Sequence, residues 1–287
     1  MRVGLRLPSN GPNATAEDVI WCARLAEELG FDSLWVNDHI IVPADEPKAA
    51  PYHRLLEPFV TLAAVSMHTE RVRLATGVLV LPIREPLLVA KQAATIDLFS
   101  KGRLTLGVGV GWEAGEFRML NVDFERRGTL CDEWIDVVRA VWTEERIAVC
   151  TSHYRLDGGI SGPPPAQSGG PPILIGGTSP RALRRAALKA DGWLAPTFLP
   201  LEEVAKGIET IRAQAPAGHK GLIYVSRRPP EASLAESHAV DEMVRQFDAL
   251  RSLGVQECTL PFPESLSVDD YAREITSFAK GVMPRIR

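Results

Sequence analysis

The stretch "VRLATGVLVLPIREPLLVAKQAATIDLFSKGRLTLGVGV", residues 72–110, decides the fold class. Its two ends, Val72–Leu81 and Arg103–Val110, are short runs of apolar and β-branched residues, as is typical of buried strands. The segment between them, Leu87–Phe99, has the length and pattern of a helix. A strand, a helix and a second strand in this order predict parallel strands joined by a right-handed crossover.

The same unit repeats along the whole chain. The other predicted strands are Val3–Leu7, Ser33–Val36, Pro172–Ile175, Trp193–Pro196, Leu222–Val225 and Val255–Leu260. The other predicted helices are one that Thr15 caps and Gly30 ends, Pro58–His68, a long helical stretch reaching Thr143, Pro180–Ala190, Leu201–Gln214, His238–Leu253 and Val268–Lys280. Eight strands, each followed by a helix, predict a (β/α)8 TIM barrel with insertions in the βα loops, as a single domain over residues 1–287. An open doubly wound sheet is the alternative, because a strand count does not prove closure. The insertions are Ala44–Leu56, after the second strand, and Ile147–Gly170, after the long helix.

The composition favours an ordinary cytoplasmic protein. The net charge is −4 and no basic stripe is present, which argues against a nucleic-acid partner. No apolar run approaches the roughly 18 residues of a membrane-spanning helix, and the charged N-terminal segment does not resemble a signal peptide. The four cysteines are scattered, as expected of reduced thiols, and the histidines form no metal-binding motif.

The active site of such a barrel lies where its strands end. Asn37, Asp38 and His39 come directly after the second strand. One interpretation is a polar turn whose side chains cap the backbone. The other is a carboxylate beside an imidazole, a pair suited to positioning and proton transfer.

Three glycine-containing stretches also fall at or near predicted strand ends. They are Thr76-Gly77-Val78 in the third strand, the run containing Gly109 and Gly111 after the fourth, and Gly176-Gly177-Thr178-Ser179 after the fifth. The first marks either tight packing or the close approach of a ligand. The second matches the dinucleotide fingerprint only weakly, so a nicotinamide dehydrogenase is a distant alternative. The third, before a proline at the start of a helix, predicts either an anion site suited to phosphate or a plain capped turn.

Taken together, four stretches carry a family resemblance. They are "FDSLWVNDH" (residues 31–39), "RLATGVLVLPIREP" (73–86), "LFSKGRLTLGVGVGW" (98–112) and "ILIGGTSPRALRRAALKADGW" (173–193). In this order they resemble the luciferase-like flavin and deazaflavin oxidoreductase family over nearly the whole chain. The Asp-His pair after the second strand is similar to the branch that uses coenzyme F420, a 5-deazaflavin.

The resemblance implies an oxidoreductase on a TIM barrel that moves a hydride between F420 and a small organic substrate. Asp38 and His39 would lie against the deazaflavin, with His39 donating a proton or guarding the reacting face and Asp38 fixing His39 or the ring. The other implied cofactor contacts are Thr76, Gly77 and Val78 with a cis Gly77–Val78 peptide behind the ring, Gly109 and Gly111 at its border, Gly176, Gly177, Thr178 and Ser179 at the phosphate, and Arg227 or Arg228 at an acidic tail.

The chain also departs from the family pattern. Some relatives place a catalytic glutamate directly after the strand-four glycines, where this chain has Trp112 followed by Glu113, so both are only candidate substrate contacts. Asn37 stands where a serine is common. A relative that uses FMN would share the fold and the phosphate site, so an FMN-dependent luciferase-like monooxygenase is the first alternative, and a non-catalytic flavin-binding protein is the second. The resemblance further implies a homodimer formed through helices near strands two and three.

Overall fold

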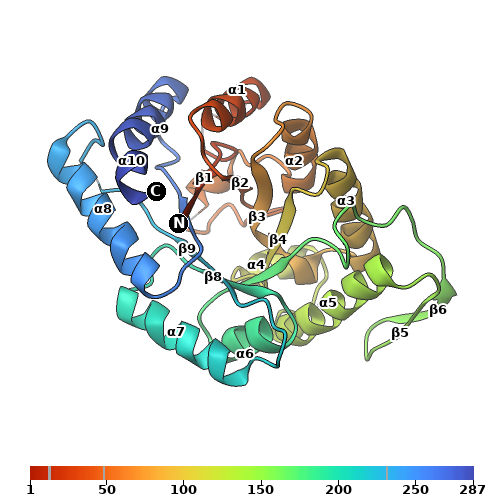
Figure 1. Cartoon of the computed structure of the whole chain (residues 1–287). Helices are drawn as coiled ribbons and strands as arrows, with labels where there is room; N and C mark the ends of the chain where they lie inside the picture. The colour runs from red at the N-terminus through yellow and green to blue at the C-terminus, as the bar shows by residue number, and fades with distance from the viewer. Residues whose placement is uncertain (12–13, 48, 231) are drawn as a thin grey trace.

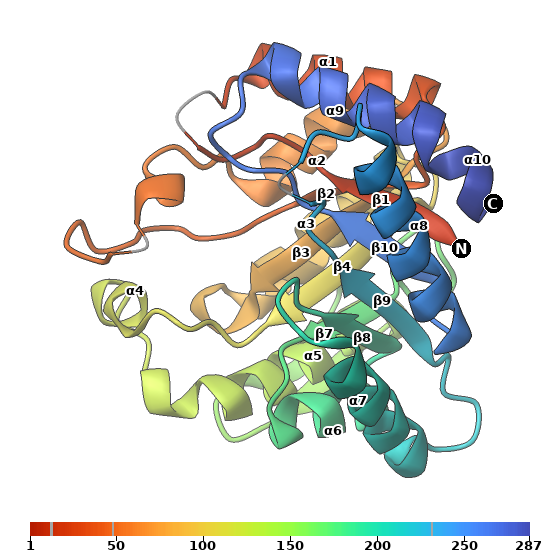
Figure 2. The same cartoon turned by 90° about the vertical axis from the view of Figure 1, so that its left-hand side faces the viewer.

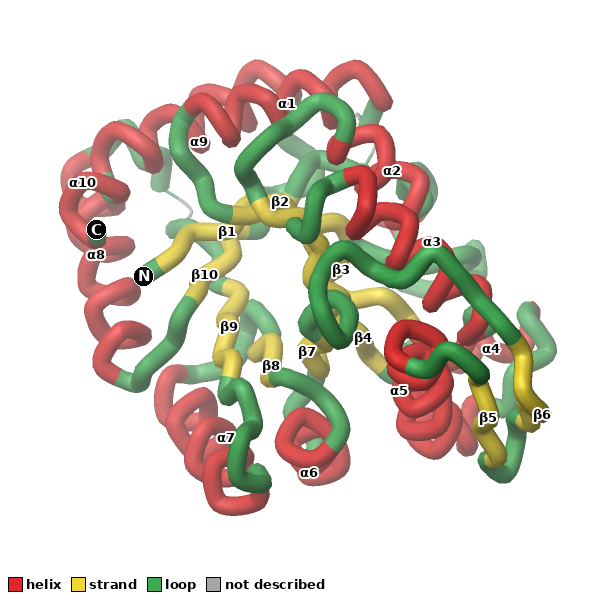
Figure 3. Tube along the Cα trace, turned by 45° about the vertical axis from the view of Figure 1, so that its right-hand side comes forward, coloured by secondary structure: helices red, strands yellow, loops and turns green. Residues whose placement is uncertain are grey.

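The computed structural model describes residues 1–11, 14–47, 49–230 and 232–287. Its centre is a closed barrel of eight parallel strands in the order β1-β10-β9-β8-β7-β4-β3-β2, seen in Figures 1 and 3. The strands are β1 Arg2–Arg6, β2 Ser33–Val36, β3 Arg73–Val80, β4 Leu104–Gly109, β7 Ile173–Gly176, β8 Gly192–Ala195, β9 Leu222–Ser226 and β10 Glu257–Leu260. Because β1 pairs with both β2 and β10, the sheet has no free edge. The predicted (β/α)8 barrel is confirmed, and the open sheet is excluded.

A ring of helices covers the barrel on the outside (Figure 1). The helices are α1 Ala16–Glu28, α2 Pro58–Ser66, α3 Pro86–Phe99, α4 Ala114–Met119, α5 Arg127–Thr143, α6 Pro180–Leu188, α7 Leu201–Gln214, α8 Ser237–Ser252, α9 Val268–Gly281 and α10 Met283–Ile286, with 3-10 turns η1 Ala50–Tyr52, η2 Leu81–Ile83 and η3 Phe124–Arg126. Their ends follow local chemistry: Thr15 caps α1 by accepting a hydrogen bond from Asp18 N at 3.0 Å, and Gly30 follows that helix with φ +87°. None of the helices within the described ranges is long and apolar enough to cross a membrane.

Side chains close the barrel at its middle and at its N-terminal end. Trp35, Leu174, Leu194 and Tyr224 pack with Ala75 into one buried cluster inside it. At the N-terminal side of this cluster, the buried Glu257 carboxylate accepts a hydrogen bond from Ser33 Oγ, and Trp35 Nε1 donates to that same hydroxyl at 2.7 Å. A ligand site must therefore open at the C-terminal end of the strands, on the left in Figure 2, where α4 and the segment between β2 and α2 lie.

The prediction of one long helix reaching Thr143 is wrong, because this segment forms three elements, α4, η3 and α5. Asn121 ends α4 in the left-handed region, with φ +58°, a conformation that asparagine tolerates. The Val122 N–H then donates to Phe117 O at 2.9 Å, and the Asp123 side chain caps the next turn. The break places α4 across the mouth of the barrel instead of along its side.

The two insertions lie in different kinds of connection. The first insertion lies in the βα connection between β2 and α2, as predicted, and its described residues include the 3-10 turn η1. The other insertion lies instead in an αβ connection, between α5 and β7, and contains an antiparallel hairpin of β5 (Ile147–Cys150) and β6 (Arg155–Gly159) that the sequence did not reveal. The hairpin projects beside α5 at the right of Figure 1. His153 lies in the turn of the hairpin and donates its backbone N–H to the Glu133 carboxylate of α5 at 3.0 Å. This bond holds the hairpin against the outside of the barrel.

Candidate active site

Asp38 follows β2 as an anchor for the loop after β3. Its carboxylate accepts hydrogen bonds from Val80 N at 2.9 Å and from Arg84 Nε and Nη2 at 3.0 and 2.6 Å. The side chain is fully buried, and that burial raises the pKa of the Asp38 carboxyl, while the Arg84 guanidinium acts in the opposite direction. Its two oxygens thus hold Arg84 and Val80, and the expected contact between Asp38 and the His39 side chain is not formed.

His39 has a different acidic partner, Glu116 of α4. His39 Nδ1 lies 2.7 Å from Glu116 Oε2, and Glu116 is completely buried. The other ring nitrogen, Nε2, accepts a hydrogen bond from Trp112 Nε1 at 3.2 Å. The Tyr52 ring packs edge-on against the imidazole with a centroid distance of 4.5 Å. His39 is therefore held on three sides at the mouth of the barrel.

Three residues of the site, Glu116, Tyr52 and Arg84, were not predicted from the sequence. Glu116 lies between Gly115 and Phe117, which are both buried, so a carboxylate on the inward face of a short helix was the available signal. Arg84 stands in the quoted "PIREP" segment, but the sequence alone does not tell which acid it meets. Tyr52 lies in the insertion after β2, a region without a periodic pattern.

The third strand is irregular at the stretch that was singled out. The Gly77–Val78 peptide bond is cis, which confirms the expectation, and the pairing of β3 with β4 shifts register between Thr76 and Leu79. A Cβ atom added to Gly109 or to Gly176 would lie 2.7 Å from a methyl group of Val78. These two glycines therefore make room for the Val78 side chain.

The remaining predicted residues of this region lie beside that irregularity. Thr76 is buried, and its hydroxyl donates to Gly107 O at 2.7 Å. Gly111 has φ +81°, and a Cβ atom there would meet Phe117 at 2.7 Å. Thr76 thus ties β3 to β4 just before the cis bond, while Gly111 makes room for Phe117 and Val80.

The predicted phosphate segment forms the N-terminus of α6. Gly177 adopts φ +107°, and Ser179 caps the helix by accepting a hydrogen bond from Ala182 N at 3.2 Å. Gly177, Thr178 and Ser179 are exposed, while Gly176 is half-buried next to Val78. The first turn of a nine-residue helix thus opens to solvent at the same end of the barrel as His39, with its positive dipole end outward.

Glu113 has a structural task, unlike Trp112. The Glu113 side chain caps α4 by accepting a hydrogen bond from Gly115 N at 2.7 Å. Trp112 is 44% exposed and contacts His39, so it remains a candidate for contact with a substrate.

Arg227 is buried, and its Nη2 has no hydrogen-bond partner among the described residues, while Arg228 is exposed. A role for either arginine toward an acidic tail stays a prediction.

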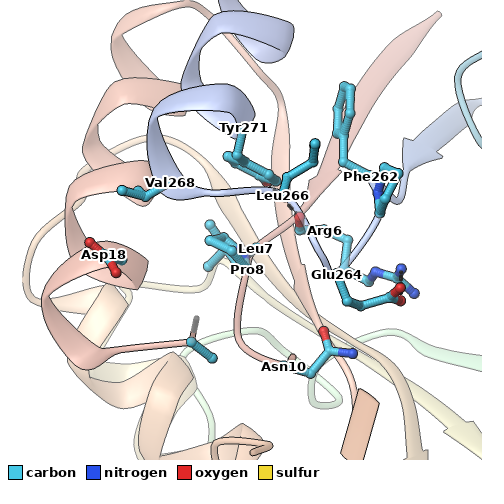
Figure 4. Close-up of a pocket in the computed structure, with 12 residues that line it drawn as sticks. Arg6, Leu7, Pro8, Asn10, Asp18, Phe262, Glu264, Leu266, Val268 and Tyr271 are labelled. Atoms are coloured by element: carbon cyan, nitrogen blue, oxygen red, sulfur yellow. Dashed lines mark hydrogen bonds and ion pairs between the residues drawn. The ribbon is translucent and has the colours of Figure 1, made fainter. Parts of the chain in front are cut away.

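A second charged pair lies near Tyr52, at the end of β1. Arg6 Nη2 donates to the Glu264 carboxylate at 2.8 Å, and Figure 4 shows both side chains at one edge of a small cavity that Asp18 and Val268 border on the opposite side. Its volume of about 20 Å³ is far below that of a cofactor site, which is roughly 300–1,000 Å³. A larger groove of about 390 Å³ lies between η2, η3 and α5, and its lining includes Arg84 but not His39. Within the described ranges, no group of three or more His, Cys, Asp or Glu side chains could hold a metal ion.

The barrel, the imidazole after β2, the irregular third strand and the open α6 N-terminus together define a class of barrel oxidoreductase. Residues 1–261 match the model of the luciferase-like monooxygenase family, and the chain belongs to that family.

Known relatives include users of both cofactors. An uncharacterised protein of Mycobacterium tuberculosis is 31% identical over 269 residues, covering 90% of this chain and 91% of the relative. The F420-dependent glucose-6-phosphate dehydrogenase of Amycolatopsis mediterranei is 30% identical, covering 76% and 66%. The FMNH2-dependent dimethylsulfone monooxygenase of Pseudomonas putida is 33% identical, covering 55% and 44%. Among solved structures, the monooxygenase RslO1 of Streptomyces bottropensis superposes with a TM-score of 0.84 at 25% identity, covering both chains completely. The family therefore contains F420-dependent and FMN-dependent enzymes.

Proposed function

We propose that the protein is an F420-dependent oxidoreductase that transfers a hydride between the deazaflavin and a small organic substrate. The observation that carries this proposal is the His39 imidazole, held by the buried Glu116 carboxylate at the mouth of the barrel. Hydride exchange at a carbon that bears oxygen requires a group that moves a proton, and a held imidazole is suited to that work at neutral pH.

The residues present fit a tricyclic cofactor with a phosphate-bearing chain. Val78 projects between Gly109 and Gly176, where any larger residue would collide with it, so it can form a flat apolar backing for a ring. The exposed Gly177, Thr178 and Ser179 at the start of α6 offer backbone and hydroxyl donors for a phosphate. When bound, F420 supplies the hydride chemistry, and the protein supplies orientation and exclusion of water.

The protein's own groups have separate tasks in this proposal. His39 supplies or accepts the proton of the substrate. Asp38 fixes the backbone of the loop after β3 through Val80 and Arg84, and so acts on the site as an anchor. The exposed Trp112 indole covers the imidazole and forms part of the substrate contact surface.

The proposal is tested by comparing two reactions under matched conditions. The purified protein is mixed with F420 and a panel of alcohols and sugar phosphates, and the visible absorbance of the deazaflavin is followed. A second series contains reduced FMN, and oxygen uptake is measured. We expect F420 reduction with at least one substrate, its loss in His39→Ala, and no protein-dependent oxygen uptake. Rapid oxygen uptake with FMN and no reaction of F420 would overturn the proposal.

The FMN-dependent monooxygenase is the competing function, and a monooxygenase among the solved structures supports it. The difference between the two cofactors that decides their reaction with oxygen is at one ring position, where a deazaflavin has carbon in place of a flavin nitrogen. The non-catalytic alternative predicts bound cofactor but no turnover in any assay and no effect of His39→Ala.

A cytoplasmic homodimer remains part of the proposal. Exposed apolar side chains on α2, at its C-cap and on α3 support self-association: Val60, Met67, Leu88, Leu98 and Phe99. Sedimentation of the wild type and of Met67→Glu tests it. We expect a dimer that the substitution weakens, and a wild-type monomer at all concentrations would refute it.

A further inference from the structure

Among the described residues, Glu116 is the one carboxylate that contacts the His39 imidazole, and both of its oxygens are engaged. Oε1 accepts hydrogen bonds from Ile40 N at 2.7 Å and from Ile41 N at 3.3 Å. Oε2 lies 2.7 Å from His39 Nδ1. The carboxylate thus binds the side chain of His39 and, at the same time, the backbone that follows it.

These contacts fix where the ring proton lies. An ionised carboxylate can only accept, so His39 Nδ1 must carry a hydrogen toward Glu116. The indole N–H of Trp112 can only donate, so Nε2 must present its lone pair. Two neighbours of opposite hydrogen-bonding character therefore require the same neutral tautomer, with hydrogen on Nδ1 and none on Nε2.

We propose that Glu116 is a positioning residue that holds His39 as the Nδ1–H tautomer, with Nε2 free to accept a proton. If the proposed function holds, this tautomer makes His39 a proton acceptor at the start of the reaction. The accepting atom is Nε2, where the Trp112 indole N–H now lies. A substrate group that donates a hydrogen bond takes the place of that indole.

The substitution Glu116→Gln tests this with little change of shape. The amides of Ile40 and Ile41 still demand an acceptor, so the new carboxamide must turn its oxygen toward them. Its NH2 group then faces His39 Nδ1, which must become the acceptor. The variant should therefore shift the His39 ring to the tautomer with hydrogen on Nε2. Two donors, Nε2–H and the Trp112 indole N–H, would then face each other.

The readout is the pair of ¹⁵N chemical shifts of the His39 ring, measured by NMR at a pH where the ring is neutral. The chain has six histidines, and a His39→Asn variant identifies the signals that belong to this one. We expect protonated Nδ1 and unprotonated Nε2 in the wild type, and the reverse in Glu116→Gln. A wild-type ring protonated on Nε2, or a ring that Glu116→Gln leaves unchanged, would overturn the inference.

Two further variants serve as controls. Trp112→Phe keeps an aromatic ring but removes the N–H, and it should leave the Nδ1–H tautomer in place, because Glu116 sets it. Glu133→Gln removes the charge from another His–Glu pair, in which Glu133 Oε1 lies 3.1 Å from His153 Nδ1 outside the barrel. It should leave the His39 signals and turnover unchanged.

Turnover supplies the second readout. With F420 and an active substrate, Glu116→Gln should lower kcat about 100-fold, the lower end of what a positioned acid or base contributes, while the Kd for F420 changes less than about threefold. An equal loss in cofactor binding would indicate a merely structural role. If the wild type fails to bind F420 at all, the proposed function falls, whereas the NMR result still decides the role of Glu116.

Discussion

Replacing Asp38 by Asn tests whether this residue is an anchor or a catalytic group. The carboxylate is fully buried and receives three hydrogen bonds, two of them from Arg84, whose side chain is 12% exposed. Breaking a buried ion pair by removing one partner costs about 3–5 kcal/mol. Arg84 keeps a second pair with Glu57 at 3.0 Å, which is 39% exposed and therefore worth roughly 0–1 kcal/mol. We expect Asp38→Asn to lower the free energy of unfolding by about 2–4 kcal/mol.

The assay is unfolding in urea, followed by fluorescence and circular dichroism on the same samples. Glu57→Gln is the matched control, because it removes the charge on the exposed side of Arg84 and should cost less than about 1 kcal/mol. A double variant with Arg84→Met should be less destabilised than the sum of the single variants, since the unpaired guanidinium is gone. If Asp38→Asn were as stable as the wild type but inactive, Asp38 would belong to the chemistry and the anchor role would be refuted.

Three further substitutions test the proposed cofactor site, at Gly176, and the residues just before β4 and β8, at Arg103 and Asp191. Gly176→Ala places a methyl group 2.7 Å from Val78. It should weaken cofactor binding, measured by fluorescence titration, about tenfold or more, which is roughly 1.4 kcal/mol. An unchanged Kd would show that Val78 does not back the ring. Arg103→Met removes five hydrogen bonds, one to Ser100 and four to the end of α2 and the turn after it, at Ser66, Thr69 and Val72. It should cost about 2–4 kcal/mol in urea unfolding, and a loss below about 1 kcal/mol would contradict this role. Asp191 is partly desolvated, yet the Ile173 N–H and nearby cations hold its pKa below the usual range. Its stabilisation is therefore present above the unfolded-state pKa of roughly 3.9 and is lost as pH falls through the folded value. The stability gap to Asp191→Asn should shrink below about pH 4, and a gap independent of pH would refute this.

Strand and helix positions followed from periodicity because each buried face repeats at a fixed spacing. The second strand was predicted to the residue, and the seventh helix, Leu201–Gln214, was too. The break after α4 was missed because a single asparagine, Asn121, ends the helix by adopting the left-handed region, and one asparagine without a glycine or proline beside it is a weak stop signal. The β5–β6 hairpin was missed because its faces are only partly buried and its residues do not alternate cleanly.

The site was only half visible in the sequence. Polar residues at strand ends located Asp38 and His39, because strand ends converge in a barrel. Their partners are not close in the chain: Arg84 lies 46 residues from Asp38, and Glu116 lies 77 residues from His39. Adjacent polar residues suggested a pair, whereas successive side chains after a strand point in different directions and meet different elements. Only the packed structure distinguishes Asp38, which anchors the loop after β3, from His39, for which we propose proton transfer.

The most direct test of the central claim is the identity of the cofactor that the protein retains. The chain is expressed in a host that makes both F420 and FMN, purified under mild conditions, and the small molecules released on denaturation are identified by mass spectrometry. The expected result is F420 released at close to one molecule per chain from the wild type, and in a smaller amount from Gly176→Ala. Tightly bound FMN with no F420, in the wild type, would contradict the proposed deazaflavin chemistry.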